Sequence, residues 1–450
     1  MQFSTTRNND RLAGGPAAHN AAAGGSPVSF RDAVLRCLPP DGGLFVPSDV
    51  MDLRQFFPSM SECTGYPELV SMLAPALLQG ELNLFSAARV AESAFDFEPE
   101  LTQLDDNFSV LKLYNGPTGT FMDFGVAFLA AVMEEFLKNE RQAMILSAAR
   151  GDNGTILDRA FRHRKGLTSV LLYPAGSIHG LDPAFFVPNG GNTIPIRING
   201  TLDDCQRLVR ETILDRVYAE RYNITSANTI NAGRLLPQSF YFLYAFIKMK
   251  KKLSGDLYFS IPSGNFGNLI SGLYAWKFGL PVNGFIAAMN ANNAFGEFIQ
   301  GGKFVKKPVI STNSPALDVG YPANYERLQS FYDEAPAVMR NMIFPASTDN
   351  AETVKSIEQA WKQYGIALDP QGAVAFSAAR DFIRRDNSSN AHVIVLATGH
   401  PAREAELFGA VTGQNLVVPE KFAMLRKEID PIAVIDPQLD ALEGAIASCF

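Results

Sequence analysis

The sequence predicts an α/β fold in which buried parallel strands alternate with helices. From residue 143 onward, short apolar segments recur with helical segments between them. A parallel pair of strands needs a crossover connection, usually a helix, and helices then cover both faces of the sheet. At 450 residues the chain is also too long for one compact core, so two or three domains are expected.

Composition changes along the chain and predicts where the domains lie. The first hundred residues are mostly helical in pattern, with a helix starting near Ser29 and a turn into a short strand over 39–47. Residues 12–26 are rich in alanine and glycine without a packing period, so we expect a flexible insertion there. The expected domains are an N-terminal domain over 1–105, a first, smaller α/β domain over 106–245 and a second, larger one over 246–450.

The predicted strands are short apolar segments rich in β-branched and aromatic residues. They are residues 143–149, 169–174, 193–198, 256–262, 284–289 and 392–398. Between them, residues 205–222 and 351–365 have the composition and length of helices.

The composition is that of a globular protein, with 47% hydrophobic and 19% charged residues. No apolar run is long enough to span a bilayer and no secretory signal is visible, so a cytoplasmic location is expected. The four cysteines are far apart and the five histidines lack metal-ligand spacing, which predicts reduced thiols and no metal. A net charge of −7 argues against nucleic acid as a partner, and the basic run at 248–252 is expected to be a solvated helix end.

The strongest local motif is PSGNFGN, where the strand over 256–262 passes through a turn into a helix. Backbone N–H groups in such a turn, with the positive end of the helix dipole behind them, can bind a phosphate. The motif is neither G-x-G-x-x-G nor a Walker P-loop, which disfavours nicotinamide and nucleoside triphosphate cofactors. An ordinary glycine-rich turn is the alternative. The candidate phosphate-binding residues are Gly264, Asn265, Phe266, Gly267 and Asn268.

Three other polar segments are candidates for a ligand site. ARGDNG follows the strand ending at Ala149, at the edge where open α/β sheets bind ligands. SANTINAGR, residues 226–234, would bring an arginine to an anion, or would be a helix start capped by Asn228 or Thr229. In ATGHPA, the Thr398 hydroxyl at a strand end would meet a ring nitrogen of a ligand or a backbone group.

Taken together, these motifs resemble those of the threonine synthase family. Its members are enzymes of amino-acid biosynthesis that depend on pyridoxal phosphate (PLP) and have the tryptophan-synthase-β fold, known as PLP fold type II. The likeness runs nearly end to end, with the motifs in the family's order. They are FSTTR, DGGLFVP, LYNGPTGTFMDFG, GDNG, SANTIN, PSGNFGN, ALDVGYPANYER and ATGHPA.

The resemblance implies a role for each motif. Residues 264–268 would hold the phosphate of PLP, Thr398 would face its pyridine nitrogen, and Asp152 would lie near its 3-oxygen. The family's reaction eliminates phosphate from O-phosphohomoserine and adds water to give threonine. The residues implied in substrate binding are Asn153, Asn228, Thr229 and Arg234.

The sequence departs from the family where its chemistry depends on one residue. The lysine that forms the Schiff base with PLP falls at Met122, and a thioether can neither form an imine nor carry a proton. Arg150, beside the expected cofactor, could supply part of its electrostatic role or bind an anion directly. Further departures from the family pattern are Asn115, Arg150, Asn153, Ala175, Ser177, Gln371 and Gly372.

These departures leave several functions open. The protein could still be an enzyme, which either uses the same pocket for a different reaction or holds PLP without a lysine link. If it is active in the family's way, it is a carbon–oxygen lyase acting on phosphates. It could instead be a non-catalytic paralogue that binds a ligand or a partner enzyme. A threonine synthase with an engineered lysine-to-methionine change is a third possibility, although the neighbouring departures favour natural divergence.

Two expectations complete the hypotheses. Lys112 would replace the missing amine only if its side chain points into the pocket, which depends on strand register. The expected partner is a small molecule with a phosphate or carboxylate group, bound by a monomer or a homodimer without nucleic acid or membrane.

Overall fold

The structure of this chain is a computed structural model. It describes residues 1–7, 26–49, 51–78, 80–149, 153–175, 190–301, 304–386, 390–420 and 431–449. The predicted insertion at 12–26, apart from Ser26, lies outside the described residues, as do Arg150, Asp152 and Ser177.

Strands form three sheets, the smallest of which contains the N-terminus. In this sheet β1 (Gln2–Thr5) lies between β2 (Val28–Ser29) and β3 (Phe45–Pro47) and is antiparallel to both. The predicted helix near Ser29 is α1 (Phe30–Arg36), and the Ser29 hydroxyl caps it by accepting a hydrogen bond from the Asp32 N–H at 3.0 Å. The start of α1 predicted from the sequence is therefore explained by the Ser29 cap.

The largest sheet is six-stranded, in the order β12-β11-β10-β13-β5-β4. All neighbouring strands in it are parallel except β4, which is antiparallel to β5. Its side chains alternate between two cores, as a sheet covered on both faces requires. Phe259 and Ile261 lie in the core shared with α9 and α10, and Tyr258 lies in the core shared with α14 and α15. The strands are β4 (Glu100–Gln103), β5 (Phe108–Lys112), β10 (Asp256–Pro262), β11 (Gly284–Met289), β12 (Ile343–Ser347) and β13 (Ala391–Ala397).

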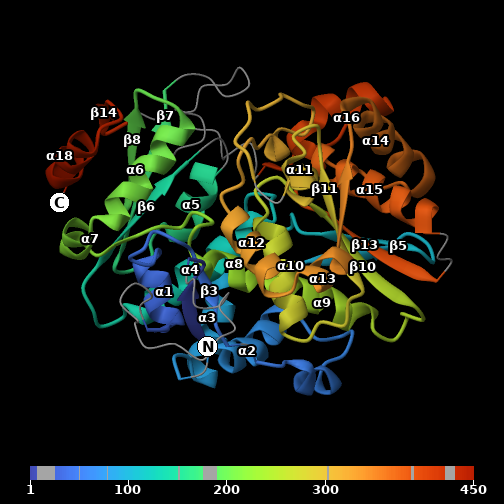
Figure 1. The fold of residues 1–450 in the computed structure, drawn as a ribbon, viewed down its shortest axis with the longest axis horizontal. Helices are drawn as coiled ribbons and strands as arrows, with labels where there is room; N and C mark the ends of the chain where they lie inside the picture. Colours follow the sequence, from blue (N-terminus) through green and yellow to red (C-terminus); the bar gives the residue numbers. More distant parts are fainter. Residues whose placement is uncertain are drawn as a thin grey trace.

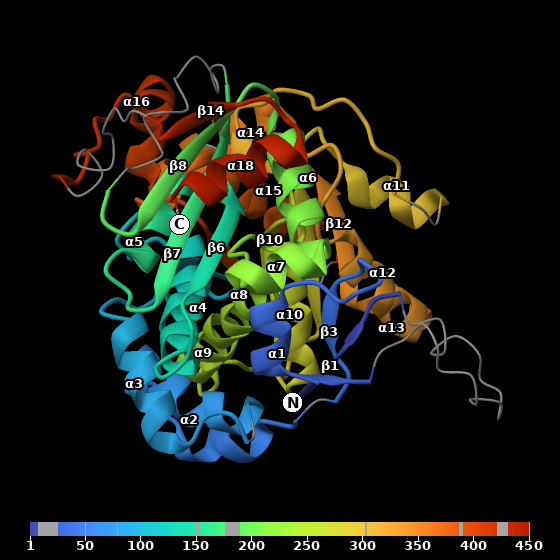
Figure 2. The ribbon, with the colours of Figure 1, turned by 90° about the vertical axis from the view of Figure 1, so that its left-hand side faces the viewer.

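The third sheet is five-stranded and parallel, in the order β14-β8-β7-β6-β9. Helices α4 and α5 cover one face, while α6, α7 and α18 cover the other; α18 and α7 lie in front of the strands in Figure 2. The strands are β6 (Ala143–Ala148), β7 (Leu167–Pro174), β8 (Thr193–Ile198), β9 (Ile224–Thr225) and β14 (Ala433–Ile435).

The two larger sheets lie on opposite sides of the molecule, with α4, α8 and α10 between them (Figure 1). The helices not yet given are α2 (Tyr66–Leu77), α3 (Leu84–Ala94), α4 (Met122–Phe136), α5 (Asn153–Phe161), α6 (Leu202–Leu214), α7 (Arg216–Tyr222), α8 (Ala232–Leu235), α9 (Ser239–Met249), α10 (Gly267–Lys277), α11 (Ala294–Gly301), α12 (Tyr325–Glu334), α13 (Pro336–Met342), α14 (Asn350–Tyr364), α15 (Pro370–Asp386), α16 (Ala405–Thr412) and α18 (Leu439–Cys449). The short 3₁₀ helices are η2 (Arg54–Ser59), η4 (Leu236–Gln238), η5 (Pro315–Leu317) and η6 (Pro401–Glu404).

Each of the two larger sheets contains a strand from the other half of the chain. β5 precedes residue 245 but pairs with β13, and β14 comes from the C-terminal region but pairs with β8. The domain boundaries expected from composition stay a prediction. No helix among the described residues is long and apolar enough to cross a membrane.

The predicted strands are all present, but one predicted helix is divided. Residues 205–222 were expected to be one helix, whereas α6 ends and α7 begins at Asp215. The backbone of Asp215 is extended, with φ −70° and ψ 90°, and its carboxylate caps α7 by accepting from the Tyr218 N–H at 3.1 Å. A capping aspartate therefore competes with the continuing helix and ends it.

Candidate functional site

The turn between β10 and α10, residues 263–266, has the geometry of an anion site. Phe266 adopts a left-handed backbone with φ 60°, and its ring is buried against Phe295 and Phe304. No side chain of the described residues caps α10. The first N–H groups of a helix have no intrahelical partner, so those of α10 are available to an anion. We call residues 264–268 the phosphate loop.

Glycine is required in the phosphate loop by close packing. A Cβ atom on Gly264 would lie 2.9 Å from the Leu317 Cα atom and 3.2 Å from the Ala316 carbonyl oxygen. Both neighbours are backbone of η5, so they cannot move aside as a flexible side chain would. The loop is thus held closely against the chain that leads to α12.

The side chain of Asn265 is already used within the protein. Its Nδ2 donates to the Thr229 hydroxyl at 3.0 Å, and its Oδ1 accepts from the Ala323 N–H at 2.6 Å. Asn324 donates to the Asn265 carbonyl oxygen at 3.2 Å. Asn265 and Thr229 therefore hold the loop in shape.

Asn268 retains a donor inside the protein. Its Oδ1 accepts from the Tyr241 hydroxyl at 2.6 Å, while its buried Nδ2 has no hydrogen-bond partner among the described residues. Buried polar groups are nearly always paired, so an unpaired donor beside the start of a helix indicates a missing acceptor. This observation and the uncapped start of α10 point to the same kind of ligand, an anion.

Asn228 fixes the end of β6. Its Oδ1 accepts from the Ala148 N–H at 2.8 Å and its Nδ2 donates to the Ala148 carbonyl at 2.9 Å, as a neighbouring strand would. The expectation that Asn228 or Thr229 caps a helix is wrong, because the cap of α8 is Asn231, which accepts from the Gly233 N–H at 2.9 Å.

Arg234, on α8, is a buried cation, and the residue is only 2% exposed. It donates to the Ala227 carbonyl at 2.7 Å and to Asn153 Oδ1 at 3.3 Å, and its Nε has no partner among the described residues. Burial lowers the pKa of Arg234 to about 10, so it remains charged at neutral pH. A buried guanidinium without a carboxylate is costly unless a ligand supplies the negative charge.

Met122 lies beside the strand end that contains Thr398. The Phe121 N–H donates to the Thr398 carbonyl at 2.9 Å, and the His400 N–H donates to the Gly119 carbonyl at 2.8 Å. Met122 is the first residue of α4 and is partly buried against the core. The Thr398 residue is 7% exposed.

Helix α4 also packs against the Arg234 segment. A Cβ atom on Gly125 would lie only 2.4 Å from the Arg234 carbonyl oxygen, so the two backbones are in contact. Asp123, next to Met122, is buried and accepts from the Thr118 N–H at 2.9 Å and the Thr118 hydroxyl at 2.7 Å. Burial raises the pKa of Asp123 to about 6.

Lys112 does not point into this site. Its Nζ donates to Glu100 Oε1 at 2.6 Å, and the Glu100 side chain is 53% exposed at the outer strand β4. Asn115 donates to the Glu98 carbonyl at 3.2 Å near the same sheet edge. The register of β5 therefore directs the Lys112 side chain toward Glu100, and Lys112 does not replace the missing amine.

Two buried charged residues near the site were missed from the sequence. Asp369 caps α15 by accepting from the Gly372 N–H at 2.9 Å, and a Cβ atom on Gly399 would lie 2.5 Å from its other oxygen. Burial raises the pKa of Asp369 to about 7. Arg327, in the segment ALDVGYPANYER, is fully buried. The sequence signal that could have identified Arg327 is its position in this family motif, three residues after Asn324.

The described residues fit the phosphate end of PLP. They do not fit a covalent link to its aldehyde. The uncapped α10, the free Asn268 donor and the small Gly264 suit a phosphate group. Thr398 offers a hydroxyl at a strand end. Met122 offers a thioether where α4 begins, and this group cannot form a bond to an aldehyde.

The parallel sheets and their arrangement match PLP fold type II, the fold of solved threonine synthase structures. The threonine synthase of Escherichia coli has a similar structure, with a TM-score of 0.85, 28% identity and coverage of 100% of both chains. The PLP-bound threonine synthase of Brucella melitensis gives a TM-score of 0.81 at 25% identity, covering 100% of this chain and 99% of the other.

Sequence comparison gives the particular family. The chain is 33% identical over 410 residues to the threonine synthase of Serratia marcescens, covering 89% of this chain and 92% of that protein. It is 31% identical to the enzyme of Escherichia coli K12, with 88% and 91% covered. Residues 372–446 match the family model "Threonine synthase, C-terminal". The chain belongs to the threonine synthase family, which confirms the resemblance expected from its motifs.

Proposed function

We propose that this member of the threonine synthase family binds PLP through its phosphate, without a covalent lysine link. A small phosphorylated or carboxylated amino-acid-type ligand would bind beside it. The observation that carries the proposal is the uncapped start of α10 beside the unpaired Nδ2 of Asn268. The PLP-bound relative from Brucella melitensis supports the choice of cofactor.

The residues of the chain would divide the work of binding. Backbone N–H groups of the phosphate loop would hold the phosphate, and the Thr398 hydroxyl would meet the pyridine nitrogen. Asp152 would lie near the 3-oxygen and Arg150 near the cofactor, as the family resemblance implies. When bound, PLP supplies an electron-withdrawing ring to an amino-acid substrate.

The substrate would be held by its negative charge. Arg234 offers an unpaired buried Nε and a guanidinium without a carboxylate partner among the described residues, and Asn153 orients it. Arginine suits planar or tetrahedral oxyanions because its donors lie in a fixed plane. Asn228 and Thr229 shape this side of the pocket through Ala148 and Asn265.

Met122 would separate this protein from the phosphate elimination and hydration of its relatives. A lysine at this position would hold the cofactor and move a proton, whereas a thioether does neither. We therefore propose a diverged activity on the same class of ligand. The second candidate is a paralogue that binds a ligand without catalysis. The Met122 thioether favours it, because this group can neither hold the cofactor nor move a proton.

The test is binding of PLP compared with pyridoxal, which lacks the phosphate. We expect added PLP to raise the melting temperature of the purified protein and pyridoxal to raise it much less, because only PLP fills the phosphate loop. Inorganic phosphate should compete with PLP. Equal effects of PLP and pyridoxal, or no effect of either, would contradict the proposal.

A further inference from the structure

Arg327 lies at the centre of the contacts around the phosphate loop. It is 0% exposed, and its guanidinium donates to no carboxylate in the described residues. Its Nε donates to the Phe45 carbonyl at 3.1 Å, and its Nη2 donates to the Ile230 carbonyl at 2.7 Å. Its Nη1 donates at 2.7 Å both to the Thr229 carbonyl and to Asn324 Oδ1. One buried side chain thus joins the N-terminal sheet, the segment before α8 and the start of α12.

The groups that Arg327 holds are those that hold the phosphate loop. Asn324 donates to the Asn265 carbonyl, and Thr229 accepts from Asn265 Nδ2. Arg327 contacts both Asn324 and Thr229, so it lies one contact away from the loop on two sides. Arg327 is therefore connected to Asn265 through both Asn324 and Thr229.

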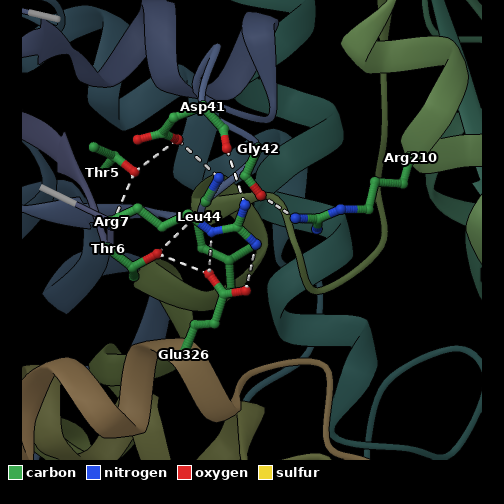
Figure 3. Close-up of polar contacts among 9 residues, drawn as sticks. Thr5, Thr6, Arg7, Asp41, Gly42, Leu44, Arg210 and Glu326 are labelled. Atoms are coloured by element: carbon green, nitrogen blue, oxygen red, sulfur yellow. Dashed lines mark hydrogen bonds and ion pairs between the residues drawn. The ribbon is translucent and has the colours of Figure 1, made fainter. Parts of the chain in front are cut away.

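The N-terminal segment is tied to the same helix by an ion pair (Figure 3). Arg7 Nη2 lies 2.8 Å from Glu326 Oε1, and Arg7 Nε donates to Glu326 Oε2 at 3.3 Å. The Thr6 hydroxyl also donates to Glu326 Oε2 at 3.0 Å and accepts from the Leu44 N–H at 2.9 Å. Glu326 immediately precedes Arg327, so this pair acts on the first turn of α12.

The turn at 41–44 completes the connection. Arg7 Nη1 donates to the Asp41 carbonyl at 2.9 Å, and the Thr5 hydroxyl donates to Asp41 Oδ1 at 3.0 Å. Arg210, on α6, donates to the Gly42 carbonyl (Figure 3). The motifs FSTTR and DGGLF, which the proposed function leaves unused, therefore meet at α12.

We propose that the N-terminal segment is a positioning part of the anion site, acting through the Arg7–Glu326 pair and Arg327 on the phosphate loop. The buried guanidinium of Arg327 contacts no carboxylate among the described residues, so an anion bound at the loop lowers the cost of burying its charge. Because coupling between two sites is reciprocal, the anion in turn stabilises the N-terminal segment. The part that concerns the anion rests on the proposed function.

The first experiment needs no ligand. Hydrogen exchange, followed by mass spectrometry, is compared in the wild type, Arg7→Gln and Arg31→Gln. Arg31, on α1, forms a comparable ion pair with Glu140 and serves as the matched control. We expect faster exchange at 263–268 in Arg7→Gln only, with 153–156 unchanged in both variants. Unchanged exchange at 263–268, or an equal increase in both variants, would overturn the inference.

The pair itself is tested with Glu326→Gln and the double variant. If the ion pair carries the effect, the increase in loop exchange in the double variant should be smaller than the sum of the two single increases, because each single variant already removes the shared ion pair. Additive increases would mean that the two residues act separately and would contradict the pair as the connection.

The second experiment measures ligand affinity. Arg7→Gln and Arg327→Lys should weaken PLP binding about fivefold or more and leave pyridoxal binding unchanged, since only the phosphate end depends on the loop. In the wild type, PLP should slow exchange at 2–7. Equal weakening of both ligands would contradict a positioning role. If the wild type binds no PLP, the proposed function fails, and the ligand-free exchange result alone decides the inference.

Discussion

At the scale of single residues, buried charge distinguishes this site from ordinary loops. Arg234 and Arg327 are both almost completely buried, and neither contacts a carboxylate among the described residues. Burial lowers the pKa of both guanidinium groups, that of Arg234 to about 10. An arginine side chain keeps its proton in proteins at neutral pH. Fixed positive charge of this kind selects anionic ligands. Its removal should affect binding more than folding at Arg234, whose Nε is unpaired, whereas Arg327 also joins three segments by hydrogen bonds.

Arg234→Met should weaken binding of a phosphorylated amino acid such as O-phosphoserine about tenfold or more, because a charge-assisted hydrogen bond contributes about 1.5–3 kcal/mol. The melting temperature should change little, since methionine fills similar volume without a buried charge. Arg159→Met on the exposed face of α5 is the matched control. Isothermal titration calorimetry measures the affinities, and equal affinity in both variants would exclude Arg234 as the anion ligand.

Asp369 should make stability fall as pH rises. Burial raises its folded-state pKa to about 7, well above the ordinary value of an aspartate, so the folded protein holds a proton that the unfolded chain releases. This stabilisation is complete below the unfolded pKa and is lost as pH increases toward 7. Asp369→Asn keeps the helix cap and removes the titration. Urea unfolding between pH 4 and pH 8 should show a smaller decrease in the variant; identical slopes would contradict this role.

At the scale of elements, the phosphate loop was the most predictable part. The strand over 256–262 and the helix after it follow from apolar pattern and turn composition, and the predicted strand matches β10 residue for residue. The reason for Gly264 could not be predicted, because η5 reaches it from a distant part of the sequence. The cap of α8 was misassigned because several neighbouring residues can cap a helix and only the backbone path selects Asn231.

Gly264→Ala should destabilise the protein by about 1–3 kcal/mol, since the added methyl group overlaps the backbone of η5. PLP binding should weaken as well, because the loop must move. Gly444→Ala in α18 is the control: a Cβ there meets nothing within 4 Å, so stability should rise by about 0.5–1 kcal/mol. Thermal unfolding measures both. A neutral Gly264→Ala variant would show that the loop has room to adjust.

At the scale of the whole molecule, the sequence predicts the class of fold and not the way the halves join. Alternation of strand and helix indicates parallel sheets, but β5 and β14 pair with strands distant in sequence. Local pattern contains no information about such partners. The same applies to the contact between α12 and the N-terminal segment, which links Arg7 to Glu326 across most of the chain.

The family is shown by similarity along nearly the entire chain, whereas the proposed loss of the covalent cofactor link depends on a single position. Met122 lies where α4 begins, beside the Thr398 strand end, in contact with the same core as the Arg234 segment. The fold is therefore that of the family, the anion site is proposed to be the same, and the covalent link is expected to be absent.

The most direct measurement is borohydride reduction in the presence of PLP, followed by mass spectrometry of the digested protein. We predict that the wild type binds PLP without a stoichiometric lysine adduct. Met122→Lys should acquire an adduct at residue 122, yet should not restore full threonine synthesis from O-phosphohomoserine, because Asn115, Asn153 and Gln371 also differ from the family pattern. A stoichiometric reduced adduct on a lysine of the wild type would contradict the account.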